Sequence, residues 1–435
     1  MSMQKTRTDA DAAADPLLAV EGLKKHFDQS NGILDRLAGD DATVKAVDGV
    51  DLTVREGETL AVVGESGCGK STLGRTILNL EDATAGSVRY RGEELADKSD
   101  GEMRPYRRDL QMIFQDPLAA LNPRQTVGEI LTAPMEVHDI GADDDDRLER
   151  AKDLLERVGL KPGHADRYPN QFSGGQQQRV GIARALSLEP ELIIADEPVS
   201  ALDVSVQAQI LNLLDELQDD LGLSLVFIAH NLSVVRHVAD RVAVMYLGEI
   251  VETAPVDELF ENPQHPYTRS LLSAVPRIDP DDRDERIILE GTVPSPMDPP
   301  SGCRFHTRCP VVIPPDDWTG TEEEFRDAFA FRNHVLSAEL DREAAKDRLR
   351  AEGRGTDEGS VAAYLVEQLL PRDPGDLPPE AADAVRAAAD ELAAGNRESA
   401  ETVVSEAFPS PCERETPETV AAAPDHVAAC HRVGD

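Results

Sequence analysis

The sequence lacks any long hydrophobic run. None of its apolar segments reaches the ~18 residues that a helix needs to cross a bilayer, within a chain of 435 residues. The opening stretch, MSMQKTRTDADAAADP, also lacks the apolar centre of a secretory signal peptide. We therefore expect a cytoplasmic protein, in which thiols stay reduced and clustered cysteines favour a metal site over disulfides.

Positive charge is also scarce. Lys and Arg total 44 against 83 Asp and Glu, which gives a formal net charge of −39. Such a surface disfavours direct binding to nucleic acid, because the negative electrostatic field of the whole protein leaves no basic face for the phosphates. It tolerates concentrated salt, where the Debye length shrinks to about 3 Å at 1 M. We interpret the charge as adaptation to a high-salt cytoplasm, with ordinary acidic solubility as the alternative.

Apolar residues make up 40% of the chain, which is enough for a real core. Runs rich in β-formers alternate with helical patterns over the first two-thirds, which predicts an α/β fold. A later block rich in Ala and acidic residues predicts amphipathic helices. The predicted division is a disordered acidic leader at 1–15, an α/β domain at 16–260, a C-terminal extension at 261–310 and 412–435, and an acidic helical insertion at 311–411.

The stretch LAVVGESGCGKST predicts a phosphate-binding loop. It reads as an apolar strand, then a Gly-x4-Gly-Lys-Ser pattern, then a helix, which is the context that this motif requires. Glycines let successive backbone N–H groups wrap phosphates, and the helix N-terminus adds partial positive charge. Lys70 should reach the β- and γ-phosphates, and the Ser71 hydroxyl should bind Mg²⁺. The alternative is a chance Gly-rich turn. The predicted nucleotide-binding residues here are Gly64, Ser66, Gly67, Cys68, Gly69, Lys70, Ser71 and Thr72.

Cys68 lies inside this loop. The dipole of the following helix could lower the pKa of its thiol. We favour the simpler interpretation that Cys68 is a small side chain tolerated in the loop.

The stretch ELIIADEP predicts the second half of the site. Four apolar residues form a buried strand that delivers Asp196 and Glu197 at its C-terminal end, where ligands bind in such sheets. Asp196 would hold Mg²⁺, and Glu197 would polarise an attacking water as general base. A solvated turn is the alternative.

Four further motifs follow in a set order. MIFQDP contains Gln115, YPNQFSGGQQQRVGIARAL contains Ser173 to Gln176, VSALDVS contains Asp203, and LVFIAHNLSVV contains His230. With the phosphate loop and the acidic strand end, this order closely resembles the ATP-binding subunits of ABC transporters. The resemblance implies a P-loop ABC ATPase with a RecA-like core, an antiparallel β-subdomain and a helical subdomain.

The resemblance also implies roles for single residues. Gln115 would bind Mg²⁺ and take part in catalysis, and His230 would contact the γ-phosphate and help to hold the attacking water. Phe27 would stack on adenine, with His26 as the less favoured choice. Asn231 stands where the family usually has Asp, and we expect little consequence. The residues that would face the nucleotide of a partner subunit are Ser173, Gly174, Gly175, Gln176 and Asp203.

Two stretches, FQDPLAALNPRQTVGEIL and NPQHPYTRSLLSAVPR, resemble the oligopeptide/dipeptide/nickel importer branch. The resemblance covers 17–310 and resumes at 412–435. GCRFHTRCP and HVAACH belong to that branch's C-terminal extension, whose cysteines can hold an iron–sulfur cluster. The block of about 100 residues between Cys309 and Cys412 departs from the branch, and it is a loop insertion if its ends lie close together. The implied ligands are Cys303, Cys309, Cys412 and Cys430.

From the residues alone, four thiolates suit a [4Fe–4S] cluster or zinc equally well. Pro310 slightly favours iron–sulfur, because it removes a competing backbone N–H beside Cys309. Free or disulfide-bonded thiols are the remaining alternative. His306 and His431 are alternative ligands, and we expect a structural role for any such centre.

The resemblance implies an ATP-hydrolysing motor at the cytoplasmic face of the membrane, bound peripherally to two permease subunits. A groove around 115–128 would take a permease coupling helix. A second ATP-binding subunit would complete the pair, a related chain or else a second copy, and an extracytoplasmic binding protein would deliver substrate. Peptides are the expected cargo, with nickel or oligosaccharides as alternatives. A soluble ABC ATPase of translation, DNA repair or iron–sulfur assembly is disfavoured by the single ATPase domain and the importer-type tail.

Overall fold

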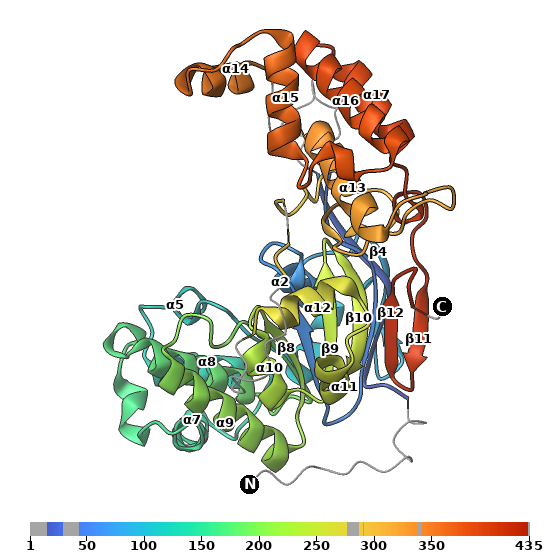
Figure 1. The fold of residues 1–435 in the computed structure, drawn as a ribbon. Coiled ribbons are helices and arrows are strands. Elements are labelled where there is room, and N and C mark those ends of the chain that lie inside the picture. Colours follow the sequence, from blue (N-terminus) through green and yellow to red (C-terminus); the bar gives the residue numbers. More distant parts are fainter. Residues whose placement is uncertain (1–14, 29–42, 276–286, 290, 338–341, 434–435) are drawn as a thin grey trace.

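The structure is a computed structural model that describes residues 15–28, 43–275, 287–289, 291–337 and 342–433. The expected leader at 1–15 therefore lies almost wholly outside the described residues. Figure 1 shows an α/β body at one end of the molecule and a group of helices from the last third of the chain at the other.

The centre of the α/β body is a sheet in the order β11-β12-β10-β9-β3-β8-β7-β6. The strands from β9 to β6 run parallel, and β10 pairs with β9 antiparallel. Every residue of β3, β7 and β8 is buried, as expected for parallel strands covered on both faces. The strands are β3 (Thr59–Val63), β6 (Leu110–Ile113), β7 (Leu192–Asp196), β8 (Ser224–Ala229), β9 (Arg241–Tyr246) and β10 (Glu249–Pro255).

A second, antiparallel sheet in the order β2-β1-β4-β5 packs beside the first. Its inward residues join β3, β7, β8 and helix α2 in one hydrophobic cluster. This sheet is the antiparallel subdomain that the predicted fold class requires. Its strands are β1 (Leu18–Asp28), β2 (Thr43–Val54), β4 (Ala85–Tyr90) and β5 (Glu93–Glu94).

Helices complete the α/β body. In Figure 1 α5, α7, α8 and α9 gather on one side, and α10 to α12 lie near the central sheet. Most begin at a side-chain cap; Thr126, for example, accepts a hydrogen bond from the Glu129 N–H at the start of α6. These helices are α2 (Lys70–Ile77), α3 (Asp100–Met103), α4 (Tyr106–Asp109), α5 (Pro117–Ala120), α6 (Val127–Val137), α7 (Asp144–Arg157), α8 (Gly174–Leu186), α9 (Val204–Leu221), α10 (Leu232–Val238), α11 (Val256–Glu261) and α12 (Pro266–Ser273).

The predicted acidic insertion contains helices, as its Ala-rich amphipathic pattern indicates. They enclose a hydrophobic cluster of their own, separate from the two clusters of the α/β body and built around Phe325, Phe331 and Phe408. We call these helices the helical block. They are α13 (Glu322–Ser337), α14 (Arg342–Ala351), α15 (Glu358–Leu369), α16 (Pro379–Ala394) and α17 (Arg397–Ala407).

The two ends of the helical block lie side by side. The Ser410 hydroxyl donates to the Ile313 carbonyl oxygen at 2.7 Å, and the Cys303 N–H donates to the Cys412 carbonyl oxygen at 2.8 Å. The chain therefore leaves the extension and returns to it at nearly the same point, through the short helix α18 (Pro411–Arg414).

The last described segment then extends the central sheet, which the sequence did not predict. Strand β12 (His426–Ala429) pairs with β10, and β11 (Thr419–Ala423) pairs with β12. The last two described strands thus form an edge of the α/β body. His426 is fully buried there and bonds Glu252 at 2.8 Å.

Candidate nucleotide site

The phosphate loop follows β3 and ends at the first residue of α2, as predicted. Gly69 takes φ 105°, a left-handed conformation that favours glycine. An added Cβ there would lie 1.9 Å from the Ala46 carbonyl oxygen, and one at Gly64 would lie 2.1 Å from that of Met245. The loop therefore rests directly on the backbone of its neighbours, and these two positions cannot carry a side chain.

Lys70 is buried at the start of α2 and reaches back across the loop. Its ammonium donates to the carbonyl oxygens of Gly64 at 2.9 Å and Glu65 at 3.0 Å. The positive charge is thus held over the loop, at a helix N-terminus, where phosphate binds readily. Ser66 and Gly67 are exposed in the same loop, and Thr72 lies in the first turn of α2.

Ser71 and Asp196 meet, as expected for a shared Mg²⁺ site. The Ser71 hydroxyl donates to Asp196 Oδ1 at 2.7 Å. Asp196 Oδ2 is buried and has no hydrogen-bond partner among the described residues, and burial, ahead of the nearby Glu197 charge, raises the Asp196 pKa. A buried carboxylate oxygen without a partner is costly. A hard divalent cation fits this pair of oxygen ligands.

Glu197 is the meeting point of three predicted catalytic residues. Its Oε2 accepts from Gln115 Nε2 at 2.9 Å and lies 3.3 Å from His230 Nδ1. Glu197 has φ 43°, an unusual backbone conformation of the kind that clusters at functional sites. Its N–H donates to the Ile228 carbonyl oxygen on β8 at 3.1 Å. The backbone is therefore fixed so that the carboxylate stands at the carboxyl ends of β6, β7 and β8.

One consideration from the sequence is wrong. The thiol of Cys68 is 3% exposed, and burial raises its pKa despite the opposing charge of Lys70. Loss of hydration outweighs the helix dipole here. Cys68 is a small buried side chain under the loop, which is the interpretation we favoured.

The residues predicted to face a partner subunit are positioned at helix starts. Ser173 is the N-cap of α8, and the Gln176 side chain accepts from its N–H at 3.1 Å. Ser173 and Gly174 are exposed and Gly175 is half-buried. Asp203 caps α9 by accepting from the Ser205 and Val206 N–H groups at 3.1 and 3.0 Å.

The predicted adenine contact lies near the end of β1. Phe27 is 36% exposed, and the Lys25 ammonium lies 4.7 Å from its ring centroid. His26 instead bonds the Asp48 carboxylate at 2.9 Å. Phe27 is thus partly exposed, with the Lys25 ammonium over its ring, whereas His26 is engaged by Asp48.

The four tail cysteines lie near one another. Burial, followed by the nearby Cys412 and Cys430, raises the pKa of Cys303 to about 12. The pKa of Cys309 is also raised, by burial and then by the other three thiols. Within the described part of the chain, however, no group of three or more His, Cys, Asp or Glu side chains has an arrangement that could hold a metal ion. The predicted cluster geometry is therefore not supported.

The two alternative ligands are engaged locally. His306 Nδ1 donates to the Cys303 carbonyl oxygen at 2.8 Å, and His431 Nε2 donates to that of Glu415 at 2.9 Å. Both rings therefore use one nitrogen to hold the backbone beside the cysteines.

Sequence reasoning missed the residues that hold Glu65, the second residue of the phosphate loop. The Glu65 N–H donates to the Tyr267 hydroxyl at 2.9 Å, and its carboxylate accepts two bonds from Arg308. Tyr267 lies in α12 and Arg308 beside Cys309, 202 and 243 positions away. The only signal in the sequence was a charged residue, Glu65, inside the phosphate-loop motif, and that residue alone does not identify its partners.

Comparison with known proteins agrees with this geometry. The family model for ABC transporters matches residues 47–200, and that for the C-terminal region of oligopeptide/dipeptide transporters matches 251–314. A domain of unknown function matches 322–425. The chain is 56% identical over 301 residues to a putative oligopeptide transport ATP-binding protein, YkfD, of Bacillus subtilis, covering 69% of this chain and 89% of the relative.

A second relative, the oligopeptide transport ATP-binding protein OppF of Salmonella typhimurium, is 56% identical over 300 residues, covering 68% of this chain and 90% of OppF. Among solved structures, a dimeric ATP-binding cassette bound to ADP and Pi is 32% identical, with a TM-score of 0.49 over 55% of this chain and 98% of that chain. The predicted family and fold class are confirmed. The chain belongs to the ATP-binding subunits of ABC transporters, in the oligopeptide/dipeptide branch.

Proposed function

We propose that this chain is the ATP-hydrolysing motor subunit of an importer for dipeptides or oligopeptides. The observation that carries the ATPase activity is the contact of Glu197 with both Gln115 and His230, beside the Ser71–Asp196 pair. Peptide cargo is supported by the names of the relatives, which are oligopeptide transport ATP-binding proteins.

The residues divide the work of hydrolysis. The backbone of the phosphate loop and Lys70 bind the phosphates of ATP. Glu197 takes a proton from the attacking water, and Gln115 and His230 hold its carboxylate in place. Phe27 stacks on the adenine. Ser71, Asp196 and Gln115 would hold Mg²⁺, which would offset negative charge on the phosphates.

Transport requires a second ATP-binding subunit. The N-terminus of α8 is a phosphate-binding device whose first residues are exposed. Ser173 to Gln176, with Asp203, would contact the nucleotide held by that subunit. We propose a related chain as this partner, with a second copy as the alternative, and an extracytoplasmic binding protein that delivers the peptide to the permease.

The permease docks on the helical side of the α/β body. A groove of about 440 Å³ there is lined by Ala120, Asn122 and Gln125, among others, and the nearby Leu118 is 45% exposed. We propose that it receives a permease helix, which would place the chain peripherally at the cytoplasmic face of the membrane. Along the described residues, no helix has the length and hydrophobicity of a bilayer-crossing segment.

We also propose a structural metal centre at the four tail cysteines, which lie near one another but do not form a metal-binding arrangement among the described residues. Burial raises the pKa values of Cys303, Cys309 and Cys430, so their thiolates are disfavoured without a cation, and soft sulfur ligands suit an iron–sulfur cluster or zinc. We favour iron–sulfur. Iron, zinc and acid-labile sulfide measured on anaerobically purified protein distinguish the two, and the absence of all three would reject the centre.

Two proposals concern the chain as a whole. We propose that the ATPase domain spans 16–260, and that 261–310 with 412–435 form one extension interrupted by 311–411; the return of the chain at Ile313 and Ser410 supports this division. We also propose that the net charge of −39 reflects a high-salt cytoplasm. We expect the free energy of unfolding to increase with salt concentration up to the molar range. A free energy of unfolding that does not depend on salt would reject the adaptation.

The test is uptake of a labelled peptide by cells from which this chain has been deleted. The wild-type chain should restore uptake, whereas Lys70→Ala and Glu197→Gln should not. Restored uptake by both variants would contradict the motor role. Uptake of nickel or an oligosaccharide that depends on this chain, with peptide uptake unchanged, would assign the motor to that cargo instead.

A further inference from the structure

The segment 303–309, here called the cysteine loop, lies against the phosphate loop. Two arginines of the cysteine loop make these contacts. Arg308 bonds a residue of the phosphate loop itself, and Arg304 bonds residues beside the loop. Neither was identified from the sequence.

Arg308 pairs with Glu65 through both nitrogens of its fork, at 2.7 and 3.2 Å. The Arg308 side chain is 8% exposed and that of Glu65 is 27% exposed. A two-bond pair of this kind fixes geometry as well as charge. The same fork lies 3.4 Å from the Tyr246 hydroxyl at the end of β9.

Glu65 is held at every polar group that it carries. Its N–H donates to Tyr267, and its carbonyl oxygen accepts from Lys70 at 3.0 Å and from the Cys68 N–H at 3.4 Å. The carboxylate is the remaining group, and Arg308 holds it. Arg308 thus completes the fixation of a residue that in turn holds the phosphate-binding lysine.

Arg304 contacts residues on the other side of the phosphate loop. It donates to the Leu247 carbonyl oxygen and to the Asp48 carboxylate. In the same β9–β10 turn, the Gly248 N–H donates to the Cys68 carbonyl oxygen at 3.0 Å. Burial alone would raise the Asp48 pKa, but hydrogen bonds from Arg304 and His26 lower it to about 2.

Phe305 packs the cysteine loop against two tyrosines beside the phosphate loop. It is fully buried, with ring centroids 5.2 Å from Tyr246 and 5.3 Å from Tyr267. These tyrosines are the ones that contact Arg308 and Glu65. The two arginines and their support are therefore packed as a group.

We propose that Arg308 is a positioning residue for ATP, through which the C-terminal extension sets the conformation and charge of the phosphate loop. Arg308 fixes Glu65, and it also neutralises a carboxylate that would otherwise repel the phosphates of ATP. The inference rests on the proposed ATP site, and it makes the extension part of nucleotide binding.

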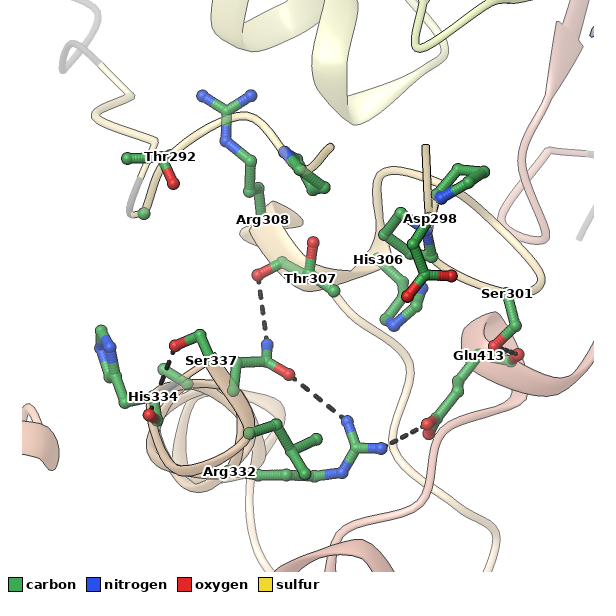
Figure 2. A pocket seen from close by; sticks show the side chains of 17 residues that line it. Thr292, Asp298, Ser301, His306, Thr307, Arg308, Arg332, His334, Ser337 and Glu413 are labelled. Atoms are coloured by element: carbon green, nitrogen blue, oxygen red, sulfur yellow. Dashed lines mark hydrogen bonds and ion pairs between the residues drawn. The ribbon is translucent and has the colours of Figure 1, made fainter. Parts of the chain in front are cut away.

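The chain offers a matched control. Arg332 pairs with Glu413, with side chains 4% and 28% exposed, close to the values of the Arg308 pair. Both arginines line a cavity of about 570 Å³. In Figure 2, Arg308 extends away from the side where Arg332 meets Glu413. Arg332 belongs to α13 of the helical block and does not contact Glu65.

The experiment measures KM for ATP, kcat and the thermal unfolding midpoint of the full chain. Arg308→Met should raise KM about tenfold, the size of a coupling between contacting residues, with kcat unchanged, because binding is lost equally in the ground and transition states. Adding Glu65→Gln should restore most of the affinity by removing the unpaired charge. The KM of Arg308→Lys should lie between those of wild type and Arg308→Met, because lysine keeps the positive charge but cannot make the two-bond contact with Glu65.

Arg332→Met should lower the unfolding midpoint and leave KM unchanged. The inference is overturned if Arg308→Met and Arg332→Met change KM alike, or if Glu65→Gln restores nothing. Lys70→Ala, measured in parallel, distinguishes failure of the positioning role of Arg308 from failure of the proposed ATP site. If Lys70→Ala loses ATP binding while Arg308→Met has wild-type KM, only the positioning role fails. If Lys70→Ala binds ATP normally, the proposed site fails and this inference with it.

Discussion

The α/β body and the helical block use their distinctive residues in different ways. In the body, charged side chains stand at strand ends where packing does not require them: Asp196 keeps a buried oxygen that has no hydrogen-bond partner among the described residues, and Glu197 holds an unusual backbone conformation. In the block, comparable residues serve the fold. Asp357 caps α15, and Arg372 bonds Asp327. Residues that the fold does not need are the ones that indicate chemistry.

The largest expected difference between the body and the block is in ATP binding. Lys70→Ala should weaken ATP binding about 100-fold, because charge-assisted contacts to the phosphates are lost. Replacing 314–409 by a short Gly-rich linker should leave ATP affinity within about threefold of wild type, since Ile313 and Ser410 already meet and a short loop is easily closed. Both are measured by titration with a fluorescent ATP analogue. Loss of binding on excision would make the block part of the nucleotide site.

A pair of cavity variants sharpens the comparison. Phe305 and Phe331 are both fully buried, one in the core of the body and one in that of the block. Replacing either with Ala should cost about 3–5 kcal/mol. If the block unfolds as its own unit, Phe331→Ala shifts only one of two calorimetric transitions.

The same pair should differ in nucleotide binding. Phe305 packs against the tyrosines beside Glu65, so its removal should also raise KM for ATP. Phe331→Ala should leave KM unchanged. Equal changes in KM for the two variants would mean that the body and the block are not separate in function.

The smallest expected effect is one of pH. His265, at the N-cap of α12, accepts from the Tyr267 N–H at 3.1 Å, and burial lowers its pKa to about 3. The unfolded chain takes up this proton near pH 6.5. Stability from the neutral ring is therefore complete above that pH and falls as the pH drops from about 6.5 toward 3.

His265→Asn keeps an N-cap acceptor but cannot be protonated. Between pH 6 and 5, wild type should lose about 1 kcal/mol more unfolding free energy than this variant. Urea unfolding at the two pH values measures the difference. Identical losses would mean that His265 titrates normally in the folded protein.

Much of the body could be predicted from the sequence, because its constraints are local. The phosphate loop, the acidic end of β7 and the order of the motifs each lie within one short stretch. The pairing of β12 with β10 could not be predicted, since the Ala-rich strands have weak β-propensity and the partners lie about 175 positions apart. Arg308 was missed for the same reason: its contact with Glu65 depends on the folded chain.

The less favoured interpretation of Cys68, a thiol pKa lowered by the helix dipole, is wrong for a different reason. Its position in a loop before a helix suggested a lowered value, but the thiol lies under the loop, where burial dominates. The local motif indicates that a helix dipole acts on Cys68. The burial of its thiol depends on the packing of distant segments, which the motif does not show.

ATP binding and ATP turnover measured together on Glu197→Gln test the central claim most directly. The account predicts wild-type affinity, because Glu197 does not bind the phosphates, and a loss of turnover of about 100-fold or more, because the general base is gone. The full-length variant should unfold at the wild-type temperature. Unchanged turnover in a folded variant would contradict the assignment of Glu197, and with it the catalytic site built around Gln115 and His230.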